Sequence, residues 1–137
     1  MRRLSALLPV FAALVTLAAC GGDASTNTGP ASVAGTYTLR TVNGAPLPFT
    51  LAQLGDDKYE VTADAITLKD GGIWTGAGTT RATESGRVST TTVTSTGTYS
   101  LTGTAITITG VTESSSGTVE RGTLTVTQDG LLSVYTK

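Results

Sequence analysis

The sequence predicts an all-β protein, an antiparallel up-and-down meander of about eight strands that curls into a closed or partly open barrel. From Gly35 onward, short runs alternate threonine with apolar, often β-branched residues, which is typical of strands with one buried face. Turns containing glycine separate these runs, and no segment after residue 33 has a convincing helical period. Because a meander hides its edges best by closing on itself, we expect a barrel rather than a two-sheet sandwich.

The first segment, residues 1–19, predicts a helical secretory signal peptide. Arg2 and Arg3 form a positive start, and an apolar run from Leu4 to Ala19 follows. A helix rises about 1.5 Å per residue, so a hydrocarbon layer about 30 Å thick requires about 20 apolar residues. The run is shorter than that, and a permanent transmembrane helix is disfavoured.

The only cysteine of the chain, Cys20, ends the sequence LAAC at residues 17–20. This sequence resembles the lipobox of bacterial lipoproteins. The resemblance implies cleavage after Ala19, lipidation of Cys20 and anchoring to a membrane of the cell envelope through that lipid. Because Gly21 follows the cysteine in place of aspartate, we expect the outer membrane. The alternative is that Cys20 is a small buried residue or lies near an ordinary cleavage site.

Three regions follow from these patterns. Residues 1–19 are the expected signal peptide, and residues 20–32 are the expected lipidated cysteine and flexible linker, rich in Gly, Ser, Thr and Asn. Residues 33–137 are the expected barrel domain. With a single cysteine no disulfide can form within the chain, so packing and strand pairing must stabilise this domain.

The first strands are predicted from alternation. In GTYTLRTV, residues 35–42, Tyr37 and Leu39 share one face, and Asn43-Gly44 is a turn signal. The stretch PFTLAQLGD, residues 48–56, fits either a turn of helix or an edge strand. A hairpin is expected next, with its turn at residues 70–72 and with inward-facing Ile66 and Leu68.

The second half of the domain repeats this pattern. A long threonine-rich run begins at Gly86 and is expected to bend at Gly97. It should pair with AITIT, residues 105–109, whose two isoleucines would face inward. In the last hairpin, Leu124 and Val126 lie on one face of the first strand, and the turn is at residues 129–130. Leu132 and Val134 are the corresponding apolar residues of the returning strand.

The start of the domain resembles that of lipocalin barrels. Gly35-Thr36-Tyr37 is similar to their G-x-W opening, with tyrosine in place of tryptophan. The longer run GTYTLRTVNGAPLP, residues 35–48, is similar to small lipocalin-like domains of bacterial lipoproteins. The resemblance implies a lipocalin-like barrel over residues 33–137. Other lipocalin motifs are not recognisable, so no ligand-binding residue is carried over from that family.

The chain lacks the side chains that most catalytic and metal sites use. It contains no histidine, which removes the usual general base and zinc ligand. Its carboxylates fall mostly at turns or solvent-facing positions, without a spaced calcium-binding loop. We therefore predict no catalytic residues, no metal and no cofactor, and hence no enzyme. The net charge of -1, without a basic stripe, argues against nucleic-acid binding.

The sequence IWTGAG, residues 73–78, is the most informative site candidate. Alternation places Trp74, Gly76 and Gly78 on one face, which creates either an internal hollow or close packing around a tryptophan anchor. The first hypothesis is a barrel that binds a small hydrophobic ligand. The second is a structural or protein-interaction module of the envelope with a filled core. In the first hypothesis the candidate ligand-binding residues are Tyr37, Trp74, Tyr99 and Leu101.

Overall fold

The computed structural model describes residues 32–137, and the predictions for the signal peptide, for Cys20 and for most of the linker lie outside the described residues. Within residues 32–137 no helix is long and apolar enough to cross a membrane. The strands are β1 (Gly35–Val42), β2 (Ala45–Pro46), β3 (Phe49–Leu54), β4 (Asp57–Lys69), β5 (Ile73–Glu84), β6 (Arg87–Thr102), β7 (Ala105–Thr109), β8 (Ser114–Glu120), β9 (Thr123–Gln128) and β10 (Leu131–Thr136).

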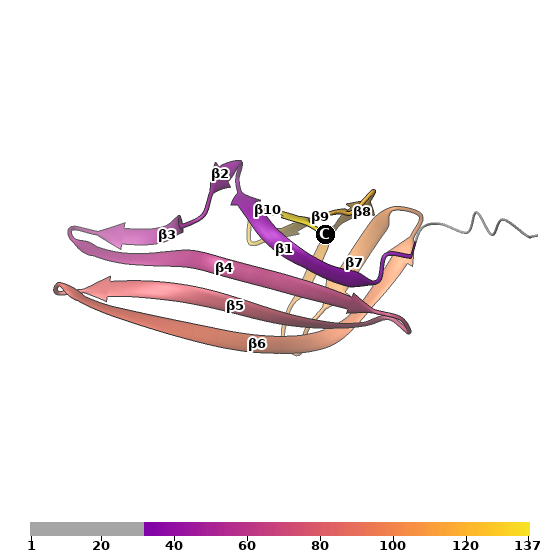
Figure 1. Ribbon diagram of the computed structural model, residues 1–137, viewed down its shortest axis with the longest axis horizontal. Coiled ribbons are helices and arrows are strands. Elements are labelled where there is room, and N and C mark those ends of the chain that lie inside the picture. The colour runs from indigo at the N-terminus through magenta and orange to yellow at the C-terminus, as the bar shows by residue number, and fades with distance from the viewer. Residues whose placement is uncertain (1–31) are drawn as a thin grey trace, which may run out of the picture.

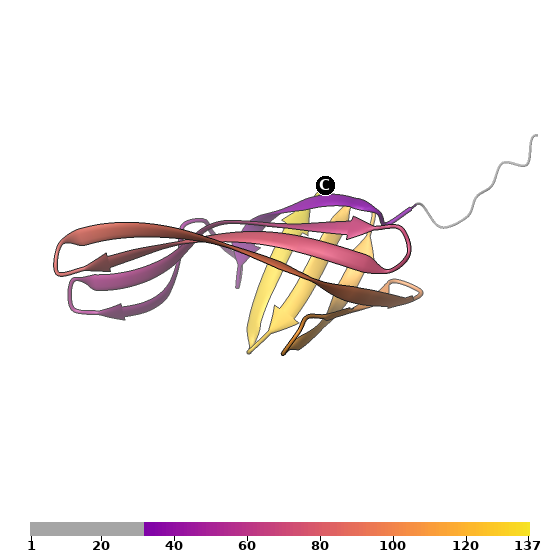
Figure 2. The ribbon, with the colours of Figure 1, turned by 90° about the horizontal axis from the view of Figure 1, so that it is seen from below.

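Eight of these strands close into an antiparallel barrel. The ring runs β1-β10-β9-β8-β7-β6-β5-β4, and β4 pairs back onto β1, with Gly35 opposite Leu68 and Thr38 opposite Ala65. Figures 1 and 2 show β7 to β10 on one side of this ring and β4 to β6 on the other. The predicted all-β meander and its closure as a barrel are therefore confirmed. β2 and β3 lie outside the ring.

Tight turns set the register of several hairpins. Asn43-Gly44, Ser85-Gly86, Arg121-Gly122 and Asp129-Gly130 have positive φ at both residues, as a type I′ turn requires. Such turns twist in the same sense as the strands they join, so each hairpin continues its twist through the turn. The turns predicted at residues 43–44 and 129–130 are both present.

The barrel interior is filled with apolar side chains. Four residues are less than 2% exposed and come from four different strands: Tyr37, Leu68, Ile106 and Leu124. Each fully buried side chain of this size stabilises the fold by about 1.5–3 kcal/mol relative to an exposed one. Leu39, Ile66, Ile108 and Val126, which the sequence places on the same inward faces, are buried as well.

Two local expectations are resolved by the structure. The stretch at residues 48–56 forms the edge strand β3 and no helical turn. On β10 the inward residues are Leu131, Ser133 and Tyr135, whereas Leu132 is 45% exposed. Tyr135 pairs with Leu124 and Ser133 with Val126. This register places Leu132 and Val134 on the outer surface, which alternation alone does not decide.

A four-stranded sheet projects from one end of the barrel. It consists of β3, residues 57–63 of β4, residues 78–84 of β5 and residues 87–96 of β6, and we call it the wing. Figure 1 shows it extending to the left, away from the point where the chain enters at Ser32. The two hairpin tips of the wing are joined by a hydrogen bond from the Ser85 N–H to Asp57 Oδ1 of 2.7 Å.

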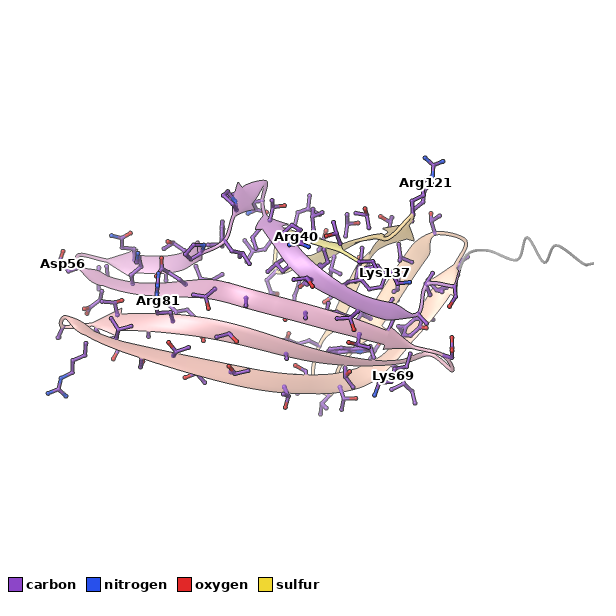
Figure 3. All side chains as sticks on the ribbon, in the orientation of Figure 1. Arg40, Asp56, Lys69, Arg81, Arg121 and Lys137 are labelled. Atoms are coloured by element: carbon purple, nitrogen blue, oxygen red, sulfur yellow. The ribbon has the colours of Figure 1, made fainter. Side chains whose placement is uncertain are left out.

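An ion cluster on the wing joins its two central strands. Glu60 on β4 accepts bonds from Lys58 Nζ at 2.8 Å and from Arg81 Nη2 and Nε at 2.7 and 2.9 Å. Figure 3 shows Arg81 on the wing. The two cations cover the carboxylate, which leaves Glu60 only 3% exposed although it lies outside the apolar core. The bond from Lys58, followed by that from Arg81, lowers the pKa of Glu60.

Candidate ligand-binding mouth

The barrel is open at the end from which the wing projects, and we call this opening the mouth. Two adjoining hollows of about 490 and 360 Å³ lie there. The two hollows adjoin, since they share five lining residues: Asp64, Ser95, Gln128, Ser133 and Tyr135. The volume suits a small ligand.

Two hydrogen-bonded side chains, from β4 and β10, line both hollows of the mouth. The Tyr135 hydroxyl donates to Asp64 Oδ2 at 2.7 Å. Burial raises the pKa of Asp64, and the bonds from Tyr135 and from the Ala65 backbone partly offset that rise. The pKa of Tyr135 is also raised, first by burial and then by the nearby Asp64 charge. The hydroxyl therefore keeps its proton and remains a donor.

All charged side chains that line the two hollows are acidic. Asp64 borders both, Glu113 borders the larger hollow and Asp129 borders the smaller one, whereas no lysine or arginine lines either. Glu113 also accepts a hydrogen bond from Gln128 Nε2, which joins the β7–β8 loop to the end of β9. The mouth therefore carries a negative potential that disfavours anionic ligands.

Apolar side chains from both the wing and the barrel rim take part in the lining of the mouth. The wing contributes Leu51, Tyr59 and Val93, which are 40%, 44% and 59% exposed. The barrel rim opposite them contributes Leu39 and Leu131. Large apolar side chains that remain exposed on facing surfaces are characteristic of a binding cleft. Together with the Asp64–Tyr135 pair, they form an amphipathic site.

Trp74 occupies the boundary between the filled interior and the mouth. Its indole Nε1 donates to the Thr109 carbonyl at 3.1 Å. A Cβ at Gly76 would lie 3.0 Å from the indole ring, and one at Gly97 would lie 2.7 Å from its nitrogen and 2.0 Å from the Thr109 oxygen. The glycines thus allow the close packing that the anchor interpretation requires. The same tryptophan also lines the larger hollow.

The other three candidate residues lie toward the opposite end of the barrel. The Tyr37 hydroxyl donates to the Val33 carbonyl at 2.7 Å, and the Tyr99 hydroxyl donates to the Lys69 carbonyl at 2.7 Å. Leu101 is opposite Ile106 and 39% exposed. Tyr37 borders a separate hollow of about 390 Å³ at that end. The four candidates therefore do not converge on one hollow, and only Trp74 borders the mouth.

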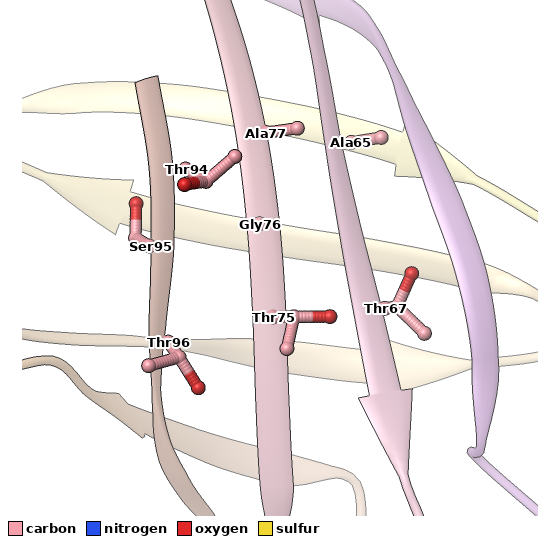
Figure 4. A pocket seen from close by; sticks show the side chains of 8 residues that line it. All are labelled: Ala65, Thr67, Thr75, Gly76, Ala77, Thr94, Ser95 and Thr96. Carbon is pink, nitrogen blue, oxygen red and sulfur yellow. The ribbon is translucent and has the colours of Figure 1, made fainter.

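A shallower hollow of about 460 Å³ lies on the outer surface of β4, β5 and β6. Figure 4 shows that its lining consists of short side chains, among them Thr67, Thr75, Thr94 and Thr96. One of them, Thr67, exchanges a hydroxyl hydrogen bond with Thr36 of β1 at 2.9 Å. This hollow is open and is lined by small side chains, and it lacks the aromatic and acidic side chains of the mouth.

Sequence reasoning missed the Asp64–Tyr135 pair. The prediction that the carboxylates lie mostly at turns or solvent-facing positions does not hold for Asp64, and Tyr135 is not among the predicted site residues. A signal for Asp64 is present in the sequence, because it lies two residues before Ile66 and four before Leu68. Period-two spacing places all three on the inward face. A carboxylate on such a face requires a hydrogen-bond donor, and Tyr135 provides it.

Neither local chemistry nor similarity assigns a known activity. Within residues 32–137 no group of three or more acidic, cysteine or histidine residues is arranged to hold a metal ion. Comparisons with protein-family models, with curated proteins and with solved structures found no match. The interpretation therefore depends on the fold and on the chemistry of the mouth.

Proposed function

We propose that the protein is a membrane-anchored lipoprotein of the bacterial cell envelope whose barrel domain binds a small amphipathic molecule at the mouth, without catalysis. The observation that carries this proposal is the pair of adjoining hollows, which combine exposed apolar side chains with the hydrogen-bonded pair Asp64 and Tyr135. The preferred ligand has an apolar body and a neutral or cationic polar end, because the charged lining is acidic.

The position of the N-terminal segment supports this arrangement. Ser32 and Val33 lie at the end of the barrel opposite the mouth, where the Lys137 ammonium donates to the Ser32 carbonyl at 3.3 Å. A lipid on Cys20, followed by the linker of residues 20–32, would attach the domain to the outer membrane at that end. The mouth would then face away from the lipid surface and remain accessible.

Ligand binding is tested by titration of Trp74 fluorescence, since this is the only tryptophan of the chain. The probes are decylamine, decanol and decanoate, which share an apolar body and differ in the polar end. We expect saturable fluorescence changes with the amine and the alcohol, and weaker binding of the carboxylate. If none of the three changes the fluorescence or the melting temperature, the ligand-binding proposal is wrong.

Two matched variants localise the binding. Ser95 borders the mouth, whereas Ser100 on the same strand is exposed beyond Gly97 and borders neither hollow of the mouth. We expect Ser95→Leu to weaken decylamine binding by filling the cleft, and Ser100→Leu to leave it unchanged. Equal affinities for the two variants would argue against the mouth as the site.

Anchoring is tested separately. Mass spectrometry of the native protein should find Cys20 as an acylated N-terminal residue, and Cys20→Ser should release the protein from the membrane fraction. An unmodified thiol at residue 20 of the mature protein would overturn the anchoring part and leave the ligand-binding part intact.

A protein-interaction module is the second candidate function. The filled interior around Tyr37, Leu68 and Leu124 favours it, because little internal space remains below the mouth. In that case the wing, with its exposed apolar side chains, would contact another protein. Loss of a co-purifying protein on mutation of Leu54, which is 85% exposed at the wing tip, would support this candidate.

A further inference from the structure

The wing has one long sheet edge without a partner among residues 32–137. β6 pairs with β5 along residues 87–98, but its pairing with β7 covers only residues 98–102. At Gly97 the edge is closed, because the Thr109 carbonyl would lie 2.0 Å from a Cβ there. The free edge therefore consists of the nine residues from Val88 to Thr96, all of them exposed.

This edge lacks the features that prevent strands from pairing between molecules. Natural edges are protected by lysine, proline, bulges or very short strands. Residues 88–96, VSTTTVTST, contain no charge and no proline, and their register with β5 is continuous. Threonine and valine strongly favour extended backbone. An edge of this kind is suited to pairing with a further strand.

The backbone groups that point outward can be assigned from the register. The Tyr99 N–H donates to the Gly72 carbonyl, on the β5 side of the strand. Because N–H groups alternate between the two sides of an antiparallel strand, the odd-numbered residues of β6 face β5. The even-numbered residues therefore point their N–H and C=O groups to the free edge: Val88, Thr90, Thr92, Thr94 and Thr96.

The sequence of the edge is nearly palindromic about Thr92. Moving outward from it, Thr91 matches Val93 in shape, Thr90 matches Thr94, and Ser89 matches Ser95. Thr92 is also the midpoint of the free edge. An antiparallel pair related by a twofold axis at this residue would match every side chain with one of equal size, and cross-strand threonine pairs are favourable.

We propose that two copies of the chain associate through antiparallel pairing of their β6 edges, with Thr92 of one copy opposite Thr92 of the other. The even-numbered residues then exchange hydrogen bonds with their counterparts, and the two wings form one continuous eight-stranded sheet. Arg87, the charged residue that precedes the edge, would lie opposite Gly97 of the other copy.

The size of the interface predicts a weak dimer. Nine residues of strand extend over about 30 Å. If the two strands make no further contacts, the surface area buried by pairing along this length is smaller than the roughly 1,200 Å² that standard interfaces bury at least. We therefore expect association that depends on concentration, with monomer dominating in dilute solution.

Disulfide trapping tests the register directly. The full chain with Cys20→Ser contains no thiol, so an added cysteine is the only one. In a hydrogen-bonded antiparallel pair the two Cα atoms lie about 5.5 Å apart, within the range that a disulfide spans. We expect mild oxidation of the Thr92→Cys variant at high concentration to convert most of the chain to a covalent dimer.

Matched controls lie on the same edge. In the proposed register Thr90 faces Thr94 of the other copy, so two Thr90 residues are four positions apart, about 13 Å along the strand. Thr90→Cys alone should therefore remain monomeric, whereas the Thr90→Cys, Thr94→Cys double variant should cross-link. If Thr92→Cys forms no more dimer than Thr90→Cys, the proposal is overturned.

A variant without added cysteine tests association itself. Thr92→Pro removes the outward N–H at the centre of the edge, where a proline is tolerated within a single chain. Sedimentation should show a concentration-dependent dimer for the parent chain and for Thr92→Val, and only monomer for Thr92→Pro. A parent chain that stays monomeric at millimolar concentration would contradict the inference.

Discussion

At the scale of single residues, glycines determine where Trp74 can pack. Gly97 lies opposite Trp74 in the β5–β6 register, and its missing side chain allows the indole to reach the Thr109 carbonyl. The sequence predicted the proximity of Trp74 and Gly76 from alternation. It did not predict the contact with Gly97, because that contact depends on the pairing of strands that are joined through a distant turn.

Gly97→Ala should destabilise the fold. The added methyl would lie 2.0 Å from the Thr109 oxygen and 2.7 Å from the Trp74 nitrogen, so β7 or the indole must move. Overpacking of this kind costs about 1–3 kcal/mol. Urea denaturation measures the loss in the free energy of unfolding.

Gly78→Ala is the matched control on the neighbouring strand. The nearest atom to its added methyl would be Asp64 Oδ1 at 3.4 Å, an ordinary contact. We expect the free energy of unfolding to stay equal or to rise by up to about 1 kcal/mol, since alanine restricts the unfolded chain. Equal losses for the two variants would contradict the packing described for Trp74.

Two carboxylates should affect stability at acid pH in opposite directions. The pKa of Asp64 is raised above its ordinary value of 3.8 by burial, so the folded state favours its protonated form. The free energy of unfolding therefore falls as pH rises from about 3.8 through the raised pKa. Asp64→Asn removes this titration, and its stability relative to the parent chain should increase over that window.

Glu60 should show the reverse behaviour. Bonds from Lys58 and Arg81 lower its pKa below 4.5, so its stabilising contribution is present above pH 4.5 and is lost as pH falls through the folded value. Glu60→Gln should accordingly destabilise the chain most near neutral pH. Urea denaturation of both variants from pH 3 to pH 7 provides the comparison, and slopes of the same sign for the two would refute the assigned environments.

At the scale of elements, β4, β5 and β6 are longer than the barrel requires. The barrel portion of β4 carries the predicted alternation of Ile66 and Leu68, whereas the wing portion of β6 is exposed at every residue and that of β5 is mostly half-buried. The sequence predicted the strands and the hairpin at residues 70–72. It did not predict the wing, because threonine-rich alternation looks the same whether a strand lies in a closed ring or projects beyond it.

Proline substitutions at neighbouring positions of β6 test which side of the strand is paired. The Thr91 N–H faces β5, so Thr91→Pro should remove a ladder hydrogen bond and reduce the free energy of unfolding by at least about 0.5–1.5 kcal/mol, the net contribution of one such bond. The Thr92 N–H faces outward, and Thr92→Pro should have a much smaller effect. Urea denaturation of dilute, monomeric protein measures both, and a larger loss for Thr92→Pro would reverse the assignment.

At the scale of the whole molecule, the alternation pattern and the number of expected strands together predicted the closed barrel. Glycine turns between short alternating runs leave few topologies, and closure removes the edges that an open meander would expose. The site that we propose for a ligand was not predictable in the same way. Of its candidate residues, Tyr37, Tyr99 and Leu101 lie toward the end at which Ser32 enters. Inward alternation identifies which side of a strand faces the interior, but it does not give the level of a residue along the barrel axis.

The two ends of the barrel consequently differ in chemistry. The end at which Ser32 enters is covered by the Lys137 side chain, whose Nζ lies 5.4 Å from the centre of the Tyr37 ring. The other end opens to the mouth beneath the wing, which is lined in part by acidic and apolar side chains. Because of this difference between the two ends, we propose the mouth, and not the end at which Ser32 enters, as the ligand site.

Mapping of amide chemical shifts on addition of decylamine tests this account most directly. The isotopically labelled full chain with Cys20→Ser should show saturable shifts at Asp64, Ser95, Ser133 and Tyr135, which border the mouth. The amides of Tyr37 and Leu101, toward the opposite end, should not move. Shifts concentrated at Tyr37 and Leu101, or no shifts at any concentration below aggregation of the amine, would contradict the account.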